Sequence, residues 1–250
     1  MTVTSNDAHH ELSATTDSPI AELVGVERTY RRGSLAVPAL RGVDFRLVAG
    51  ELVAIVGPSG CGKSTLLNVL SAVDRADSGR VMVCGQDLMS VSESALTLLR
   101  RRQVGVVFQD FQLMPNLTAE ENVALPLALD GRSDPERVRN LLARVGLDAR
   151  GSHYPSEMSG GEQQRVAVAR ALVHKPALVI ADEPTGNLDS KNGNDVLELL
   201  GALRTEENTA LVIATHDAGV AARADRTFTM RDGREVDGAN ADASPASGAR

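Results

Sequence analysis

The 250-residue sequence has no tryptophan and only six other aromatic residues, four phenylalanines and two tyrosines. Hydrophobic residues nevertheless make up 42% of the chain, which is enough to bury a full core. That core must therefore be built mainly from aliphatic side chains. The length allows one large domain or two small ones.

The sequence also has few cysteines and no long apolar run. The two cysteines, Cys61 and Cys84, are typical of a reducing compartment and predict no structural disulfide. No apolar run reaches the roughly 18–20 residues of a membrane-spanning helix. The first 20 residues are polar and lack the apolar centre of a signal peptide. We therefore expect a soluble protein of the cytosol.

Basic residues are fewer than acidic ones: 26 Lys and Arg residues stand against 33 Asp and Glu residues, which gives a formal net charge of −7. This balance argues against a general nucleic-acid binder, although a local basic patch is compatible with it. Only three basic residues are lysines, at positions 63, 175 and 191. Because lysine is so rare here, the position of Lys63 is informative.

Residues 57–64, GPSGCGKS, fit the G-x-x-x-x-G-K-[ST] pattern of a phosphate-binding loop. An apolar run at 52–56 predicts a buried strand before the loop, and apolar residues at helical spacing predict a helix after it. The alternative, a glycine turn before an ordinary helix, is disfavoured by this strand–loop–helix context. Backbone N–H groups and the helix N-terminus would bind phosphate, with Lys63 at the β- and γ-phosphates and Ser64 on Mg²⁺. The residues expected to contact the nucleotide are Gly57, Pro58, Ser59, Gly60, Cys61, Gly62, Lys63, Ser64 and Thr65.

A second apolar run, 177–181, ends in the acidic pair Asp182 and Glu183. A carboxylate at the end of a buried strand beside a phosphate loop occupies the position that holds Mg²⁺. The neighbouring Glu183 could act as general base for an attacking water. A solvated acidic turn is the alternative, and the phosphate loop argues against it.

Two more strand predictions end in polar residues: 104–108 is followed by Gln109, and 210–214 leads into Thr215-His216-Asp217. Open α/β sheets place their ligands at the carboxyl ends of strands. Gln109 is therefore a candidate ligand contact, and His216 a candidate γ-phosphate contact. A loop-capping glutamine and a structural histidine are the alternatives that the strand positions leave open.

Residues 158–165, MSGGEQQR, precede a long helix predicted to end near His174. Ser159 and Glu162 have the S-x-x-E spacing of a capping box. That box does not explain Gly160 and Gly161, since glycine costs roughly 1 kcal/mol against alanine within a helix. Paired glycines at a helix start suit the close approach of a ligand to exposed N–H groups.

The remaining segments complete an α/β pattern. We expect strands at 21–26 and 43–48 with a loop at about 31–38, and a helical insertion at about 110–151 with one helix interrupted at Pro126. Tyr30 either stacks on a purine or packs on its neighbours, and spacing alone does not decide between these. Residues 1–20 and 237–250 are predicted to be disordered tails.

The phosphate loop, Gln109, MSGGEQQR, DEPTGNLD and THD together resemble, in composition and in order, the ATP-binding subunit of an ABC transporter. The resemblance covers roughly residues 21–236. It implies a phosphate-loop (RecA-like) ABC ATPase core with a mixed β-sheet, an antiparallel β edge and a helical subdomain at about 110–165.

The resemblance also implies roles for individual residues. Tyr30 would stack on adenine, and Gln109 would contact Mg²⁺ and the attacking water. Glu183 would be the catalytic base, and His216, matching the switch histidine of the family, would help to orient the water. Glu162 departs from the family, which most often has glutamine there. The remaining matches are Asp182 on Mg²⁺, Asp189 in the D-loop, and Ser159, Gly160 and Gly161 on the γ-phosphate of ATP held by a second subunit.

The implied cofactors are therefore ATP and Mg²⁺, and the implied assembly is a head-to-tail homodimer closing around two ATP molecules. The segments FQDFQLMPNLTAEENVALPL and DEPTGNLDS are similar to the branch that contains macrolide exporters, lipoprotein-release complexes and a cell-division ATPase. This branch works with integral-membrane permeases of the extracellular-loop type, at the inner face of the cell membrane. The alternatives are a soluble ABC ATPase acting on DNA or ribosomes, and a regulator of a cell-wall hydrolase.

Overall fold

The computed structural model describes residues 18–33 and 35–236. Most of the two predicted tails lies outside these residues, although Ile20 already packs against the core. The strands are β1 Ala21–Arg32, β2 Leu35–Leu47, β3 Leu52–Val56, β4 Ser78–Val83, β5 Gln86–Asp87, β6 Val104–Val107, β7 Leu178–Asp182, β8 Ala210–Thr215, β9 Arg226–Arg231 and β10 Arg234–Glu235. The α-helices are α1 Lys63–Leu70, α2 Glu93–Gln103, α3 Ala119–Leu129, α4 Pro135–Arg144, α5 Gly160–Leu172, α6 Ser190–Glu207 and α7 Ala218–Ala221, with short 3-10 turns at Asp148–Arg150 and Pro155–Glu157.

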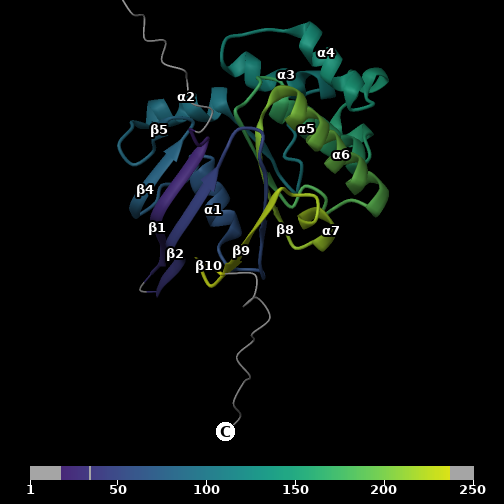
Figure 1. Ribbon diagram of the computed structural model, residues 1–250. Helices are drawn as coiled ribbons and strands as arrows, with labels where there is room; N and C mark the ends of the chain where they lie inside the picture. The colour runs from purple at the N-terminus through teal and green to yellow at the C-terminus, as the bar shows by residue number, and fades with distance from the viewer. Residues whose placement is uncertain (1–17, 34, 237–250) are drawn as a thin grey trace, which may run out of the picture.

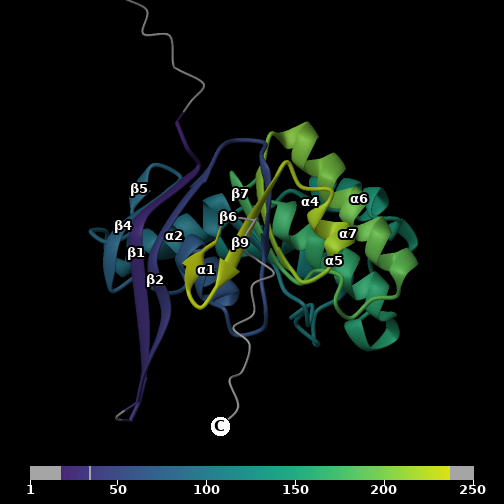
Figure 2. The ribbon, with the colours of Figure 1, turned by 60° about the horizontal axis from the view of Figure 1, so that its bottom comes forward.

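The strands form two sheets with α1 between them (Figures 1 and 2). One is antiparallel with the order β2-β1-β4-β5, and the other has the order β10-β9-β3-β8-β7-β6, parallel except for β10. In Figure 1 the antiparallel sheet lies on one side of the molecule and helices α3 to α6 on the other. The predicted α/β core with a mixed sheet and an antiparallel β edge is confirmed.

The first hairpin is longer than the sequence predicts. The expected loop at about 31–38 is wrong, because β1 and β2 remain paired up to Arg32 and Leu35. The outer half of this hairpin is exposed on both faces, so its residues show no alternation of apolar and polar side chains. Pro38 fits because β2 is an edge strand and the register shifts between Arg28 and Thr29.

The helices between β6 and β7 begin where capping signals place them. Thr118 and Glu121 form the reciprocal capping box of α3, and the carboxylate of Asp134 caps α4. The predicted interruption at Pro126 is wrong, since α3 runs through this residue to Leu129. Packing of α3 on α5 outweighs the backbone hydrogen bond that proline removes. The limits of a helical subdomain at about 110–165 remain a prediction.

The core is aliphatic, as the composition predicts, and its main aromatic contact is an edge-to-face pair of Phe45 and Phe228 with centroids 5.2 Å apart. β3, β8, β7 and β6 are neighbours in one parallel sheet, so their carboxyl ends lie at the same edge. The phosphate-loop motif and the other candidate residues at strand ends all follow these strands. The sheet therefore gathers four segments that are far apart in the sequence.

Candidate active site

The GPSGCGKS loop connects β3 to α1 and is packed too tightly for most side chains. A Cβ added to Gly57 would lie 2.2 Å from the carbonyl oxygen of Met230. Gly62 caps α1 with a φ of 110°, and a Cβ there would lie 2.4 Å from the carbonyl oxygen of Ala39. Glycine is therefore required at both positions by backbone that approaches from β9 and β2.

Lys63 is buried and its ammonium group folds back across the loop. Nζ donates hydrogen bonds to the carbonyl oxygens of Gly57 at 2.7 Å and Pro58 at 3.1 Å. These carbonyls hold a full positive charge in the concavity that the loop encloses. Cys61 makes no such contribution through its side chain, which belongs to the hydrophobic core. Any contact of Cys61 with a ligand must come from its backbone.

Ser64 and Asp182 meet at the sheet edge. The Ser64 hydroxyl donates to Oδ2 of Asp182 at 3.0 Å, joining the start of α1 to the end of β7. Burial raises the pKa of the Asp182 carboxyl, a rise that the hydrogen bond from Ser64 opposes. A nearby cation would offset the same burial penalty. Hydroxyl, carboxylate and phosphate oxygens suit Mg²⁺, which commonly takes only one or two protein ligands.

The described residues contain no cluster of three or more His, Cys, Asp or Glu side chains that could hold a metal ion by themselves. A cation at Ser64 and Asp182 would therefore need further oxygens from a bound ligand. This agrees with the usual manner in which Mg²⁺ accompanies a nucleotide. The residues present fit a magnesium ion that arrives with ATP.

Glu183 and His216 form the second polar pair of this edge. Oε1 of Glu183 lies 3.0 Å from Nδ1 of His216, which follows β8. Glu183 also has a φ of 45°, a left-handed conformation that costs a non-glycine residue about 1–2 kcal/mol. Its backbone N–H donates to the carbonyl of Ala214, which fixes the turn against β8. The carboxylate is thus held beside the histidine by backbone and side chain together.

Gln109 is tied to the loop that follows β7. Its Nε2 lies 3.4 Å from Oδ1 of Asn187, and Asn187 returns a 3.1 Å hydrogen bond to the Gln109 carbonyl. Asn187 also donates to the carboxylate of Asp110. Asn187 had no predicted role. Its place between Gly186 and Asp189 in the DEPTGNLD segment was the only sequence feature that could have pointed to one.

The MSGGEQQR segment starts α5 with the predicted capping box. The Ser159 hydroxyl accepts from the N–H of Glu162, whose carboxylate accepts in turn from the N–H and hydroxyl of Ser159. The N–H of Ser159 is the main cause that lowers the pKa of Glu162. Arg150 adds an ion pair at 3.2 Å. Glu162 is therefore engaged within its own chain.

The two glycines of this segment have different neighbours. A Cβ on Gly161 would lie 2.9 Å from the side chain of Asn192, so α5 and α6 approach closely there. A Cβ on Gly160 would make only an ordinary contact with Phe111 at 3.5 Å. Packing within the chain thus favours glycine at position 161 whether or not a ligand binds there, so Gly160 is the stronger sign of a ligand.

Asp189 caps α6, and the N–H of Asn192 is the main cause that lowers its pKa. Tyr30 lies on β1 with its hydroxyl 2.7 Å from Oδ2 of Asp74 and the Arg28 guanidinium 4.9 Å above its ring. Of the candidate residues, the structure joins Ser64 to Asp182 and Glu183 to His216 at one edge. The Ser159 and Tyr30 contacts described above lie outside these two pairs.

This edge can bind a polyphosphate and activate a water molecule. The backbone of the glycine loop, a helix N-terminus and Lys63 offer positive charge, while Ser64 and Asp182 offer oxygens to a cation. Glu183, with His216 beside it, is placed to accept a proton. Among the described residues, no helix combines the length and the apolar character needed to span a bilayer.

The comparison with known proteins agrees with this geometry. The pattern of the family described as "ABC transporter" matches residues 40–186. The lipoprotein-releasing system ATP-binding protein LolD of Shewanella oneidensis is 46% identical over 217 residues, which cover 86% of this chain and 94% of that protein. The macrolide export ATP-binding/permease protein MacB of Shigella flexneri is 44% identical over 222 residues. That match covers 88% of this chain but only 34% of MacB.

Among solved structures, the dimeric ATP-binding cassette MJ0796, in a post-hydrolysis state bound to ADP and Pi, is similar with a TM-score of 0.80 and 39% identity. The similarity covers 86% of this chain and 96% of that one. At this identity the likeness extends beyond the fold to the sequence of the cassette. The chain therefore belongs to the ABC transporter family, as an ATP-binding and ATP-hydrolysing cassette.

Proposed function

We propose that this cassette powers an ABC exporter or mechanotransmission complex together with a separate permease of the extracellular-loop type, at the inner face of the cell membrane. The observation that carries the proposal is the convergence of Ser64–Asp182 and Glu183–His216 at one sheet edge, in a chain similar to LolD and to the ATP-binding part of MacB. LolD is named for lipoprotein release and MacB for macrolide export.

In this proposal the phosphate loop, from Gly57 to Thr65, binds the phosphates of ATP, and Lys63 leaves its carbonyl partners to contact the β- and γ-phosphates. Ser64, Asp182 and Gln109 would hold Mg²⁺, which would supply positive charge at the transferring phosphoryl group. Glu183 accepts a proton from the attacking water while His216 orients it. Catalysis is then mostly positioning and electrostatic stabilisation.

The second half of each site comes from another copy of the chain. The N-terminus of α5, with Ser159, Gly160 and Gly161, would cover the γ-phosphate bound by the partner's phosphate loop, and Asp189 would lie near this interface. A helix N-terminus favours an anion through its free N–H groups. The dimeric state of the similar cassette supports assembly of two copies.

The membrane partner would dock beside Gln109. A groove of about 390 Å³ opens there between α2, β6, α3 and α5, and Phe108 and Gln112 contribute to its wall. Arg170 fixes this wall by donating to the carbonyl oxygens of Phe111 and Gln112. A segment seated in the groove would contact the same stretch of chain that carries Gln109. Docking in this groove would therefore act directly on the segment that carries Gln109 to the catalytic edge.

The test is capture of the partner. Tagged Glu183→Gln protein is mixed with ATP and detergent-solubilised membranes of its own host, and mass spectrometry identifies the co-purifying chains. A four-helix permease with a large extracellular domain is the expected result, and the same capture without ATP is the control. Recovery of ribosomes or DNA would replace the transport proposal by a soluble ATPase. Recovery of a cell-wall hydrolase with the permease would favour the regulatory alternative.

A further inference from the structure

Tyr30 does not stand alone on β1. Its hydroxyl donates to Oδ2 of Asp74, and the guanidinium of Arg28 lies over its ring. Arg28 in turn makes a two-pronged contact with Asp74, at 2.8 Å and 3.0 Å, and a 2.7 Å contact with Asp77. Ring, cation and carboxylate thus hold one another in a closed set of contacts.

This set covers one face of the Tyr30 ring with a cation, an arrangement that is favourable for an aromatic face. The residue nevertheless keeps 37% of its surface exposed. Arg28 and Asp74 are themselves mostly buried, each with a side chain 22% exposed, so their contacts are less screened by water than those of a surface pair. Tyr30 therefore keeps surface open to a ligand although Arg28 lies over its ring.

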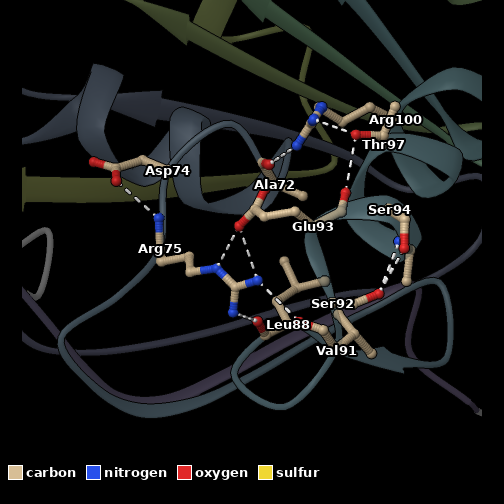
Figure 3. A network of polar contacts seen from close by, with 11 residues as sticks. Ala72, Asp74, Arg75, Leu88, Val91, Ser92, Glu93, Ser94, Thr97 and Arg100 are labelled. Atoms are coloured by element: carbon tan, nitrogen blue, oxygen red, sulfur yellow. Dashed lines mark hydrogen bonds and ion pairs between the residues drawn. The ribbon is translucent and has the colours of Figure 1, made fainter.

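Asp74 also connects the ring to the phosphate loop. It follows α1, the helix that begins at Lys63, so its place in space is set by that helix. The N–H of Arg75 donates to Asp74 at 2.8 Å, as Figure 3 shows, and the Arg75 guanidinium contacts Glu93 at the start of α2. The same guanidinium donates to the carbonyl oxygens of Leu88 and Val91 (Figure 3). The carboxylate that orients Tyr30 is thus braced from two sides.

We propose that Arg28 and Asp74 are positioning residues that fix the Tyr30 ring, with one face covered and the other left for the purine base of ATP. This inference rests on the proposed nucleotide-binding function and on stacking of Tyr30. Holding the ring in advance removes the entropy cost of ordering it when the base binds. Because Asp74 is anchored behind α1, it also sets the position of the base relative to the phosphates.

The experiment compares ATP with ribose 5′-triphosphate, which has the phosphates and the sugar but no base. Dissociation constants are measured with Mg²⁺ in a Glu183→Gln background, which prevents turnover. The variants are Arg28→Gln, Asp74→Ala and Tyr30→Ala. Arg80→Gln is the matched control, because it removes an exposed ion pair with Glu22 from the same sheet.

We expect ATP affinity to fall about 3- to 10-fold in Arg28→Gln and in Asp74→Ala, the usual cost of one side chain that must be ordered on binding. Affinity for the base-free triphosphate should stay unchanged, as should both affinities in the control. Wild-type ATP affinity in both variants would overturn the inference, and so would an equal loss for the two ligands. If Tyr30→Ala binds ATP normally, the stacking role itself fails, which is a separate outcome.

A spectroscopic readout tests the contact directly. The chain has no tryptophan and only two tyrosines, so Tyr154→Phe leaves Tyr30 as the single tyrosine. A carboxylate that accepts from a phenol quenches tyrosine fluorescence, since it can take the proton in the excited state. Asp74→Ala in this background should therefore raise the emission of Tyr30, and ATP should change it where ribose 5′-triphosphate does not. Unaltered emission in a folded Asp74→Ala protein, verified by its melting curve, would contradict the hydrogen bond.

Discussion

The two halves of the candidate nucleotide site are built in opposite ways. At the sheet edge, side chains from separate strands hold one another, as Ser64 does with Asp182 and Glu183 with His216. At the start of α5, Ser159 and Glu162 satisfy each other within four residues. The first half is a product of tertiary structure, whereas the second is a local property of one helix.

This difference bears on how the site is completed. The sheet edge joins residues up to 118 positions apart, so it exists only in the folded cassette. The capping box at α5 presents helix N–H groups whenever the helix forms, so it can be offered to a second copy without rearrangement. In the proposed head-to-tail dimer, two such halves from different chains would make one closed site.

The largest effect is expected at the phosphate loop. Lys63→Ala removes the only full positive charge that the loop itself holds, and hydrogen bonds to charged groups are worth about 1.5–3 kcal/mol before the attraction to neighbouring phosphates is added. ATP binding should therefore weaken by at least about 100-fold, or vanish. Isothermal titration with ATP and Mg²⁺ checks this, with Lys191→Ala on α6 as a lysine control. Unchanged affinity would reject the phosphate-loop assignment.

Glu183→Gln should separate binding from chemistry. The amide retains the shape of the carboxylate but cannot accept a proton from water, and a general base contributes typically 10²–10⁴-fold to rate. Turnover should fall by about that factor while ATP affinity stays near the wild-type value. Size-exclusion chromatography with ATP should show a trapped dimer. Hydrolysis at the normal rate would place the base elsewhere on the sheet edge.

The half of the site at the start of α5 can be tested by mixing two inactive chains. Gly160→Ala should fold normally, because its added methyl group meets nothing closer than 3.5 Å, yet it places a carbon on the face of α5 proposed to meet ATP. Each variant alone, Gly160→Ala or Lys63→Ala, should have little ATPase activity. An equal mixture should regain up to roughly a quarter of wild-type activity, because half the dimers contain one intact site.

The mixing experiment has a clear negative outcome. If the phosphate loop and the start of α5 of one chain served the same nucleotide, no mixture would regain activity. Gly161→Ala is the instructive comparison, since its Cβ would lie 2.9 Å from Asn192 and should lower stability as well as activity. Thermal denaturation of both variants distinguishes a lost ligand contact from a damaged helix interface.

The smallest effect concerns the contact between the end of α5 and the start of β6. His174 follows α5 and contacts the carbonyl of Val104 at the start of β6, and burial lowers the pKa of its imidazole below the ordinary value. The unfolded chain therefore takes up a proton first as the pH falls below about 6.5. Stability should decrease with acidification in that window, because the unfolded state then binds more protons than the folded state.

The expected size is a shift in melting temperature of a few degrees at most. Melting curves between pH 7.5 and the onset of acid unfolding would measure it, and His174→Gln should remove this part of the slope. Carboxylates such as Asp225, whose pKa is lowered chiefly by the N–H of Leu52, lose their contribution only at lower pH. An identical slope in His174→Gln would assign the effect to other groups.

Much of the cassette could be predicted because its signals are local. The capping residues Thr118, Asp134 and Ser159 lie at helix starts in the structure. The glycine loop after an apolar strand was equally readable, since the backbone geometry it needs restricts the residue types. Buried parallel strands are continuous apolar runs, which is why β3, β7 and β8 were found.

Other features could not be read from the chain. The length of the β1–β2 hairpin depends on pairing across the sheet rather than on an apolar pattern. α3 continues through Pro126 because its packing on α5 outweighs a local preference. Asn187 and Asp74 received no role, since their contacts with Gln109 and Tyr30 join residues 78 and 44 positions apart.

The sequence by itself determined most of the elements, their order and the residue types that phosphate chemistry requires, because helix caps, glycine turns and apolar strands act over a few residues. Only the tertiary structure decided which of those residues touch. It brought Ser64 to Asp182 and Glu183 to His216, turned the Cys61 side chain into the core, and gave Gly161 a neighbour in α6. Such contacts join residues that are far apart in the chain. They depend on how the sheets and helices pack, which no short stretch of sequence specifies.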